Sequence, residues 1–371
     1  MKLLLVVFLM SLLSGQLGAI ALAQGVTLYL HDVVVVLIVV YGFYSGAIRR
    51  ATTGFHPVKP IAAFVIVGTL SLLANASTVP IDALWKGSLY LLRWVAYAGV
   101  YLAFSGSSVP SLFLLRGLFF LGSGLAVTGL LQFFLYPDLR NLMYVGWDPH
   151  YYRVFSTLFD PNFAGILFVL TLIVGATFLQ QKREIGVIGG MGVSLTALLL
   201  TYSRSSYLAF LAAIVMWIIL HKKWKIGLVG LLLFLVAIVY LPRPGREALS
   251  LDRFDSTVSR LNNWSESVQR IAQKPILGYG FNALPFLQVD SSLPSKAGAG
   301  IDNSFLFVGV TTGFVGLIAY GWLLWSMMRM GKHWLILASL VAVIVHSLFV
   351  NSLFYPWVVL WLWILLASVD T

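Results

Sequence analysis

Apolar segments long enough to cross the roughly 30 Å hydrocarbon core of a bilayer follow one another along most of the chain. They are continuous runs rather than period-two alternations, which favours helices over the strands of a barrel. The sequence therefore predicts an all-α polytopic membrane protein with about twelve transmembrane helices. The expected spans are 3–23, 33–48, 60–77, 88–104, 111–135, 161–180, 185–201, 205–220, 226–241, 303–328, 334–350 and 355–369.

One large polar loop, residues 242–302, separates the ninth span from the tenth. It divides the chain into transmembrane helices at 1–241, the loop subdomain at 242–302 and transmembrane helices at 303–371. Helical spacing of apolar residues predicts a helix inside the loop, capped near Asp255-Ser256-Thr257 and stopped by Pro275. Those apolar residues are Val258, Leu261, Val268 and Ile271. The loop gathers the cations Arg243, Arg246, Arg253, Arg260, Arg270, Lys274 and Lys296, a pattern that indicates an anionic ligand.

Composition agrees with a membrane protein, because 60% of the residues are hydrophobic and only 10% are charged. The absence of cysteine excludes disulfides, thiolate nucleophiles and cysteine-based metal sites. The net charge of +11 suits contact with anionic lipid head groups, and it does not require a nucleic acid partner.

Positive charge is distributed unequally between alternate connections. The short outer connections hold only Lys86, Arg140, Arg153 and Arg204. By the positive-inside rule the richer set is cytoplasmic, so both termini are expected in the cytoplasm and the large loop outside. The cytoplasmic set holds Lys2, Arg49, Arg50, Lys59, Lys182, Arg183, Lys222, Lys223, Lys225, Arg329 and Lys332.

The first span allows two interpretations. Lys2, an apolar run and Ala21-Leu22-Ala23 are typical of a signal peptide with its cleavage site. The run is also long enough to span the membrane, which favours its retention. Removal of residues 1–23 would leave eleven spans and would keep every later loop on its side.

The outer connections supply the first candidate residues. Asp160 and Asn162 open the sixth span, where they serve either as helix caps or at a site. Arg153 either binds substrate or snorkels to lipid head groups. Arg204 lies in a very short outer turn among hydroxyls, where its planar fork can bind a phosphate in bidentate fashion. Arg93 lies inside the fourth span and must face either a buried partner or a substrate.

The large loop and its exit supply the second group of candidates. Arg260 and Trp264 are spaced as neighbours on one helix face, which suits a phosphate next to a stacked sugar ring or an interfacial helix. The glycines of Lys274–Asn282 permit a tight turn and a close backbone approach. Asp302 stands at the start of the tenth span, either as its N-cap or as a general base.

Four motifs in this order resemble the O-antigen ligase and O-antigen polymerase superfamily of bacterial envelope assembly: Arg153 followed by FDPNFAG, then YSRSSY, then the Arg260–Arg270 helix ending in KPILGYGFN, then DNSFLFVGVTTGFVGL. The resemblance covers roughly residues 120–330. It implies a multi-pass glycosyltransferase in the bacterial cytoplasmic membrane that uses an undecaprenyl-pyrophosphate-linked glycan as donor, with no metal, cofactor or nucleotide sugar.

The resemblance also implies roles for individual residues. Arg153, Arg204 and Arg270 match arginine positions of the family, and Arg260 is the next candidate. We expect Asp302 and Arg204 to be catalytic, and we expect the donor pyrophosphate or glycan to be bound by Arg153, Arg204, Arg260, Arg270, Trp264, Asn303 and Arg93. Further partners are a glycan, lipid or protein acceptor, membrane lipids and a candidate chain-length regulator.

One departure from the family pattern bears on the reaction. Ligases carry a histidine just before the tenth span, whereas this chain has Asp302-Asn303. The change favours a polymerase, which joins one lipid-linked repeat unit to another, over a ligase, which transfers glycan to its final acceptor. His150 also lies outside, without an assigned role. A transporter of a lipid-linked anionic glycan is a third alternative, but no inverted repeat or broken helix is evident in the sequence.

Overall fold

The structure is a computed structural model that describes residues 1–23, 25–52, 57–181, 184–241, 252–286, 300–330 and 334–370. The cations Lys182, Arg183, Arg243, Arg246, Lys296 and Lys332, counted in the sequence analysis, lie outside these ranges.

Within the described ranges the chain forms fourteen α-helices and one short hairpin. The hairpin pairs β1 (Ala19–Ala23) with β2 (Val26–Tyr29) in antiparallel orientation. The helices are α1 (Lys2–Leu13), α2 (Leu30–Tyr44), α3 (Ala47–Thr52), α4 (Val58–Ala74), α5 (Ile81–Ser105), α6 (Ser111–Leu135), α7 (Pro161–Gln181), α8 (Ile185–Leu200), α9 (Arg204–His221), α10 (Trp224–Tyr240), α11 (Asp252–Gln273), α12 (Ser304–Met330), α13 (Trp334–Ser347) and α14 (Pro356–Asp370).

The predicted fold class is confirmed at the level of an all-α protein with several apolar helices. Each of the last eleven predicted spans lies largely on one α-helix. In the described part of the chain, four helices are long and apolar enough to cross a membrane by themselves, namely α6, α7, α9 and α12. Most of the others are apolar helices of 10–17 residues. The exact number of spans therefore stays a prediction.

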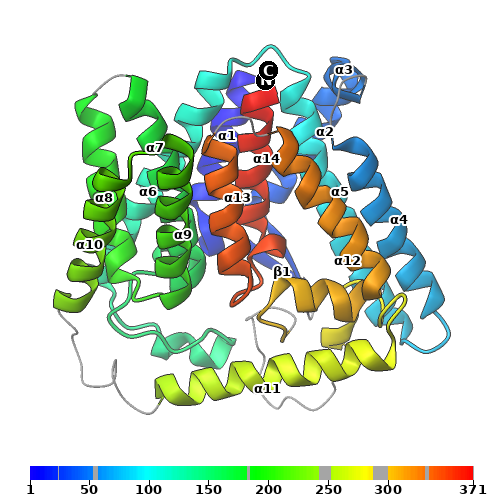
Figure 1. Cartoon of the computed structure of the whole chain (residues 1–371). Helices are drawn as coiled ribbons and strands as arrows, with labels where there is room; N and C mark the ends of the chain where they lie inside the picture. The colour runs from blue at the N-terminus through cyan, green and yellow to red at the C-terminus, as the bar shows by residue number, and fades with distance from the viewer. Residues whose placement is uncertain are drawn as a thin grey trace.

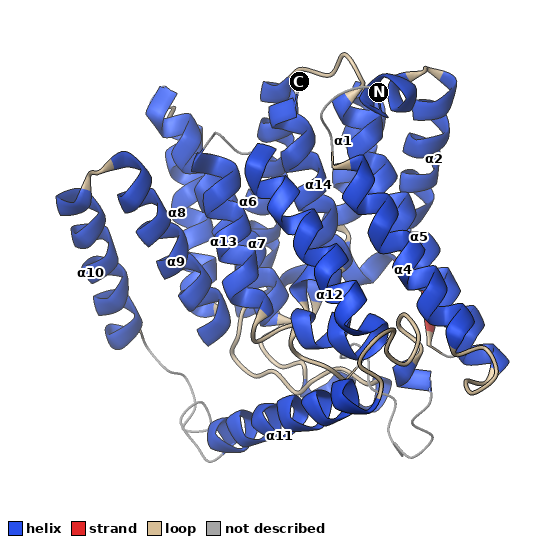
Figure 2. Cartoon of the chain, turned by 45° about the vertical axis from the view of Figure 1, so that its right-hand side comes forward, coloured by secondary structure: helices blue, strands red, loops and turns tan. Residues whose placement is uncertain are grey.

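The helices form a bundle with two distinct ends (Figure 1). Both termini lie at one end, and α11 lies across the other, where it covers the connections between helices (Figures 1 and 2). We call this second end the loop end. It also carries the short 3₁₀ segments Arg140–Val145 and Ser156–Leu158 between α6 and α7.

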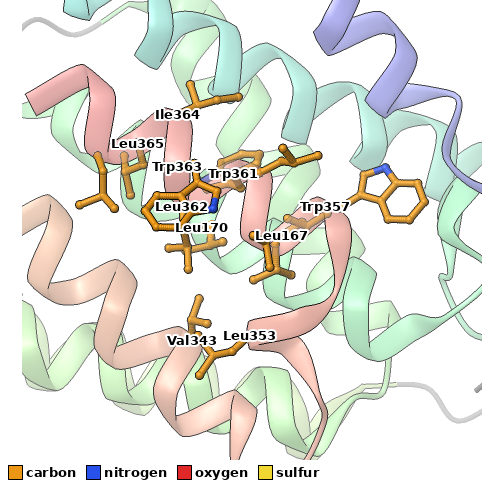
Figure 3. Close-up of a cluster of buried hydrophobic side chains, with 14 of the residues drawn as sticks. Leu167, Leu170, Val343, Leu353, Trp357, Trp361, Leu362, Trp363, Ile364 and Leu365 are labelled. Atoms are coloured by element: carbon orange, nitrogen blue, oxygen red, sulfur yellow. The ribbon is translucent and has the colours of Figure 1, made fainter. Parts of the chain in front are cut away.

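The core of the bundle is centred on α14. Every residue from Trp357 to Ala367 is buried, as expected for a helix that is apolar on all sides. Figure 3 shows these side chains packed with Leu167 and Leu170 of α7, Val343 of α13 and Leu353. A rigid centre of this kind fixes the positions of the helix ends that meet at the loop end.

The first predicted span is wrong in its second half. The helix ends at Leu13, and residues 19–23 form strand β1 instead. Gly15 has a φ of +58°, and a Cβ there would lie 2.2 Å from the carbonyl oxygen of Thr157. The last carbonyls of α1 are bound from elsewhere, Leu12 by Trp357 Nε1 at 2.8 Å and Leu13 by the Thr157 hydroxyl at 2.8 Å. These tertiary contacts end the helix early.

The tenth predicted span, α12, is a broken helix, contrary to the sequence expectation of unbroken helices. Gly313 has φ 66° and ψ −166°, and the helix kinks there. The segment that follows α11 pairs with the interrupted backbone. Tyr279 N donates to Val310 O at 2.9 Å, and Phe314 N donates to Pro275 O at 2.7 Å. Backbone groups freed by the break are thus satisfied within the protein, as an apolar environment requires.

The helix predicted in the large loop exists as α11, but it starts earlier than expected. It begins at Asp252, so Asp255-Ser256-Thr257 lie inside the helix rather than at its cap, and it ends at Gln273, before Pro275. Val258, Leu261 and Val268 are exposed on it. Ile271, the fourth predicted apolar residue, does pack on the bundle, beside Gly309 of α12. Ser267, which was not among the four, is also buried there.

Candidate active site

Arg260 and Asp302 meet at the loop end. Arg260 Nε lies 3.8 Å from Asp302 Oδ2, and both side chains are partly exposed. Asn263, three residues after Arg260 on α11, accepts from Asp302 N at 3.4 Å through Oδ1 and donates to the Gly300 carbonyl through Nδ2. One face of α11 therefore holds the segment that leads into α12. Two residues separated by a long stretch of loop form a single charged pair.

The carboxyl group of Asp302 has a perturbed pKa. Partial burial raises it above the ordinary value of 3.8, the nearby charge of Asp148 adds to the rise, and the Arg260 guanidinium opposes it. A carboxylate with a raised pKa is a stronger proton acceptor in its ionised form. The geometry leaves Asp302 able to act as a general base beside a cation.

Asn303, rather than Asp302, caps α12. Its Oδ1 accepts from Phe305 N at 2.8 Å and from Leu306 N at 3.1 Å, which is the pattern of an N-cap. Its Nδ2 donates to Leu348 O at 3.0 Å, at the end of α13. Asn303 is buried. The alternative that Asp302 is the N-cap is therefore wrong. The side chain of Asn303 makes structural hydrogen bonds at both of its polar atoms, and its predicted contact with substrate stays a prediction.

Arg153 and Arg204 come from loops that lie side by side. Arg153 Nε donates to Thr201 O at 2.8 Å, and Val154 N donates to Leu200 O at 2.9 Å, so the first loop runs along the turn between α8 and α9. Arg204 is the first residue of α9 and is exposed. The structure thus brings two predicted arginines to the same region of the loop end.

A buried polar network fixes the turn that carries Arg204. Ser203 caps α9, and its hydroxyl donates to Asn162 Oδ1 at 2.8 Å. The hydroxyl oxygens of Ser205 and Ser206 each lie 3.2 Å from Nε2 of His346. Nδ1 of the same histidine lies 2.6 Å from the hydroxyl oxygen of Ser352. The sequence analysis missed His346 and Ser352. An ionisable residue near the end of an apolar span was the available signal.

Asp160 caps α7, which confirms the helix-cap interpretation of this residue. Its Oδ1 accepts from Asn162 N at 2.7 Å and from Phe163 N at 3.4 Å. Burial raises the pKa of Asp160, while the bond from Asn162 opposes that rise. Asn162 binds Ser203 with its side chain, so it joins α7 to α9 rather than capping a helix.

Asp148 and His150 lie with Asp160 in one cluster in which the ligand atoms are within 4.8 Å of one another. Asp148 is exposed on one side, but the protein around its carboxyl group removes part of its hydration, which raises the pKa of Asp148, and Arg153 opposes the rise. Burial also lowers the pKa of His150 well below its ordinary value, and Arg153 adds to this effect. His150, which had no role in the sequence analysis, therefore lies beside a predicted site arginine.

Trp264 faces the bundle from α11. Its ring centroid lies 6.1 Å from that of Phe349, which follows α13. Its indole Nε1 is buried and has no hydrogen-bond partner within the described part of the chain. Arg270, further along the same helix, lies 4.0 Å from Glu266. The predicted roles of Trp264 and Arg270 in substrate binding stay predictions.

Arg93 belongs to a separate buried cluster. Its Nη2 lies 3.1 Å from Asp32 Oδ2 and donates to Thr27 O in the hairpin. Tyr97 donates to Asp32 Oδ1 at 2.6 Å. Of the two expected roles for Arg93, the structure contains the buried ion pair, which anchors the β1–β2 hairpin to α5. Contact of Arg93 with substrate stays a prediction.

Comparison with known proteins bears on the same residues. No curated protein matches the chain. A family model described as O-antigen ligase matches residues 189–321, a range that contains Arg204, Arg260, Trp264, Arg270 and Asp302. Arg93, Arg153 and the Asp148 cluster lie outside the match. Residues 189–321 of this multi-pass membrane protein are therefore an O-antigen ligase family domain.

Proposed function

We propose that the protein polymerises undecaprenyl-pyrophosphate-linked oligosaccharide repeat units at the outer face of the cytoplasmic membrane. The observation that carries this proposal is the pairing of Asp302 with Arg260 at the loop end, inside the O-antigen ligase family domain. The pair supplies a proton acceptor and a cation at one place. Transfer of a glycan from a lipid pyrophosphate needs both.

The arginines fit the charge of the leaving group. Departure of undecaprenyl pyrophosphate leaves negative charge on phosphate oxygens, and guanidinium groups held in place stabilise such charge as it develops. Arg204 is exposed at the first turn of α9, on a turn held by the buried serine and histidine network. Arg153 is bonded to the same turn. We assign pyrophosphate binding to Arg204 and Arg153, and we propose Arg260 as a further cation for the same group.

Asp302 would act on the acceptor. An acceptor hydroxyl attacks the anomeric carbon of the donor glycan and forms the new carbon–oxygen bond. The bond from that carbon to the phosphate oxygen breaks, and its electron pair leaves with the pyrophosphate. The proton of the hydroxyl passes to the Asp302 carboxylate, whose raised pKa suits this task.

A carboxylate in place of the histidine of ligases favours the polymerase over transfer of glycan to a final acceptor. The broken helix α12 does not favour a transporter, although transporters use broken helices to bind substrates. Backbone groups at the break are bonded to the segment after α11, so they are engaged in the fold.

The test is to resolve, by size, the lipid-linked glycans in cells that lack the protein. We expect single repeat units to accumulate on the lipid carrier at the outer face. Long polymers on the carrier, unattached to a final acceptor, would instead identify a ligase. Absence of both from the outer face would identify transport. Restoration by the wild-type protein but not by Asp302→Asn would tie the result to the proposed site.

A further inference from the structure

Three side chains with metal-ligating atoms converge in the connection between α6 and α7. One ligand atom each from Asp148, His150 and Asp160 lies within 4.8 Å of the other two. A carboxylate pair by itself is common on protein surfaces, so the cluster needs a further observation before it indicates a ligand.

That observation comes from His150. The residue is only 8% exposed, and its Nε2 is buried with no hydrogen-bond partner in the described part of the chain. A buried polar atom without a partner costs free energy, which a bound ligand would recover. A neutral imidazole flanked by two carboxylates offers a lone pair to a cation.

The cluster is also held in place by the fold. Asp160 is fixed as the cap of α7, and both capping bonds use Oδ1, so Oδ2 is the oxygen available to a cation. The backbone of His150 is fixed as well, because Leu139 N donates to His150 O at 2.8 Å. Asp148 is exposed, so the cluster is open on that side. The arrangement is buried on one side and accessible on the other.

The charges of the cluster favour a cation. Two carboxylates close together repel each other, and Arg153, which acts on all three groups, offsets only one of their two charges. A bound cation balances the charge of the two carboxylates when both are ionised. The same arginine reduces the expected affinity, which argues for a site of moderate strength.

We propose that Asp148, His150 and Asp160 form a binding site for a divalent first-row metal ion. One imidazole with two carboxylates suits ions of the Mn²⁺ or Zn²⁺ class better than a purely oxygen-binding ion. Three protein ligands leave coordination positions for water or for an oxygen of a ligand, and the open side at Asp148 provides the access. The family resemblance implies that glycan transfer needs no metal, and the proposed site does not depend on that reaction.

The test measures Mn²⁺ binding directly on the full-length protein in detergent, after treatment with a chelator and without any glycan. Free Mn²⁺ is followed by electron paramagnetic resonance during a titration. We expect one saturable site per chain, with nitrogen hyperfine coupling from His150. Both His150→Ala and Asp160→Asn should weaken binding at least about tenfold. Asn can still cap a helix, so Asp160→Asn removes the charge while α7 keeps its cap.

Asp138→Asn is the matched control, because Asp138 lies in the same connection but pairs with Arg140 at 2.8 Å. It should leave Mn²⁺ affinity unchanged. The proposal is overturned if wild-type protein shows no saturable site, if nitrogen coupling is absent, or if the control weakens binding as much as the two ligand variants. Size-exclusion profiles establish that each variant is folded. Since no donor is present, failure of this test leaves the proposed transferase function unaffected.

Discussion

Asp302 and Asn303 are adjacent in the chain, but they have different tasks. Asn303 caps α12 and binds the end of α13, whereas Asp302 pairs with Arg260 across the entrance to the same helix. Because the cap is supplied by the neighbour, the carboxylate of Asp302 is not needed to start α12. A substitution at each position therefore separates stability from chemistry.

We expect Asp302→Asn to lower the rate of glycan transfer by about 10²–10⁴-fold, the range typical of a lost general base. Its thermal unfolding should stay close to that of the wild type. By contrast, Asn303→Ala should reduce stability by about 1 kcal/mol through the lost cap. Transfer assays with a purified lipid-linked donor and thermal unfolding in detergent measure the two effects. A small rate loss for Asp302→Asn would exclude Asp302 as the base.

The pH dependence of transfer provides a second test of Asp302. A general base must be ionised, so activity should fall as the pH drops through the pKa of Asp302, which burial raises. Arg260 opposes that rise, so Arg260→Gln should move the acid limb of kcat/KM to higher pH. Rates measured across the acid range decide the question. If Arg260→Gln leaves the acid limb at the same pH, the group that titrates is not the Asp302 carboxyl paired with Arg260.

Arg204 allows a direct test of anion binding, because it is exposed at a helix start. Arg204→Ala should lower transfer by about 10²–10³-fold, as loss of a donor to developing charge does. Membrane insertion should be intact. Arg140→Ala is the matched control, since Arg140 is an arginine of the α6–α7 connection that is paired with Asp138. Wild-type product formation by folded Arg204→Ala protein would remove Arg204 from the mechanism.

At the scale of the elements, α11 and the segment after it shape the loop end. α11 presents Arg260, Asn263 and Trp264 to the bundle, and the following segment fills the break in α12. The glycine at the break is needed for two reasons, since φ is +66° and a Cβ would lie 2.2 Å from the Ile276 carbonyl oxygen. The break thus ties the segment after α11 to α12.

Gly313→Ala should therefore destabilise the protein, by about 1–3 kcal/mol for the backbone conformation alone, with the steric clash in addition. We expect a lower yield of folded protein and a lower temperature of unfolding in detergent. Gly321→Ala in the same helix is the control, because nothing lies within 4 Å of a Cβ there. Equal stability of the two variants would mean that the break is not required.

At the scale of the whole molecule, the two ends of the bundle differ in what they carry. The two termini lie at one end, and α11 lies at the other (Figure 1). From the positive-inside rule we propose that the first end faces the cytoplasm. A site at the loop end would then face the outer surface, where lipid-linked glycans are joined in the proposed function.

Single cysteines can test this orientation, because the chain has no cysteine of its own. We expect Gln269→Cys, at an exposed position of α11, to react with a membrane-impermeant maleimide in intact cells. Ile185 is 91% exposed at the start of α8, and Ile185→Cys should react only after permeabilisation. Labelling of both in permeabilised cells is the control. The reverse pattern in intact cells would invert the proposed orientation.

Sequence alone determined the fold class and nearly all helix positions, because each span must be a long apolar run to lie in a membrane core. It also identified Arg204 and Asp302 as candidates, because charge near apolar spans is costly and thus informative. Arg260 was identified by its helical spacing with Trp264 in the polar loop. Only the tertiary structure decided which charges are neighbours. The pairing of Arg260 with Asp302 and the burial of Arg93 against Asp32 join residues distant in sequence. The convergence of Asp148 with Asp160 depends on how the connection between α6 and α7 folds back on itself. Hydropathy alone predicts that α1 continues past Leu13 and that α12 is unbroken. In both places, contacts from remote segments replace the helical hydrogen bonds instead.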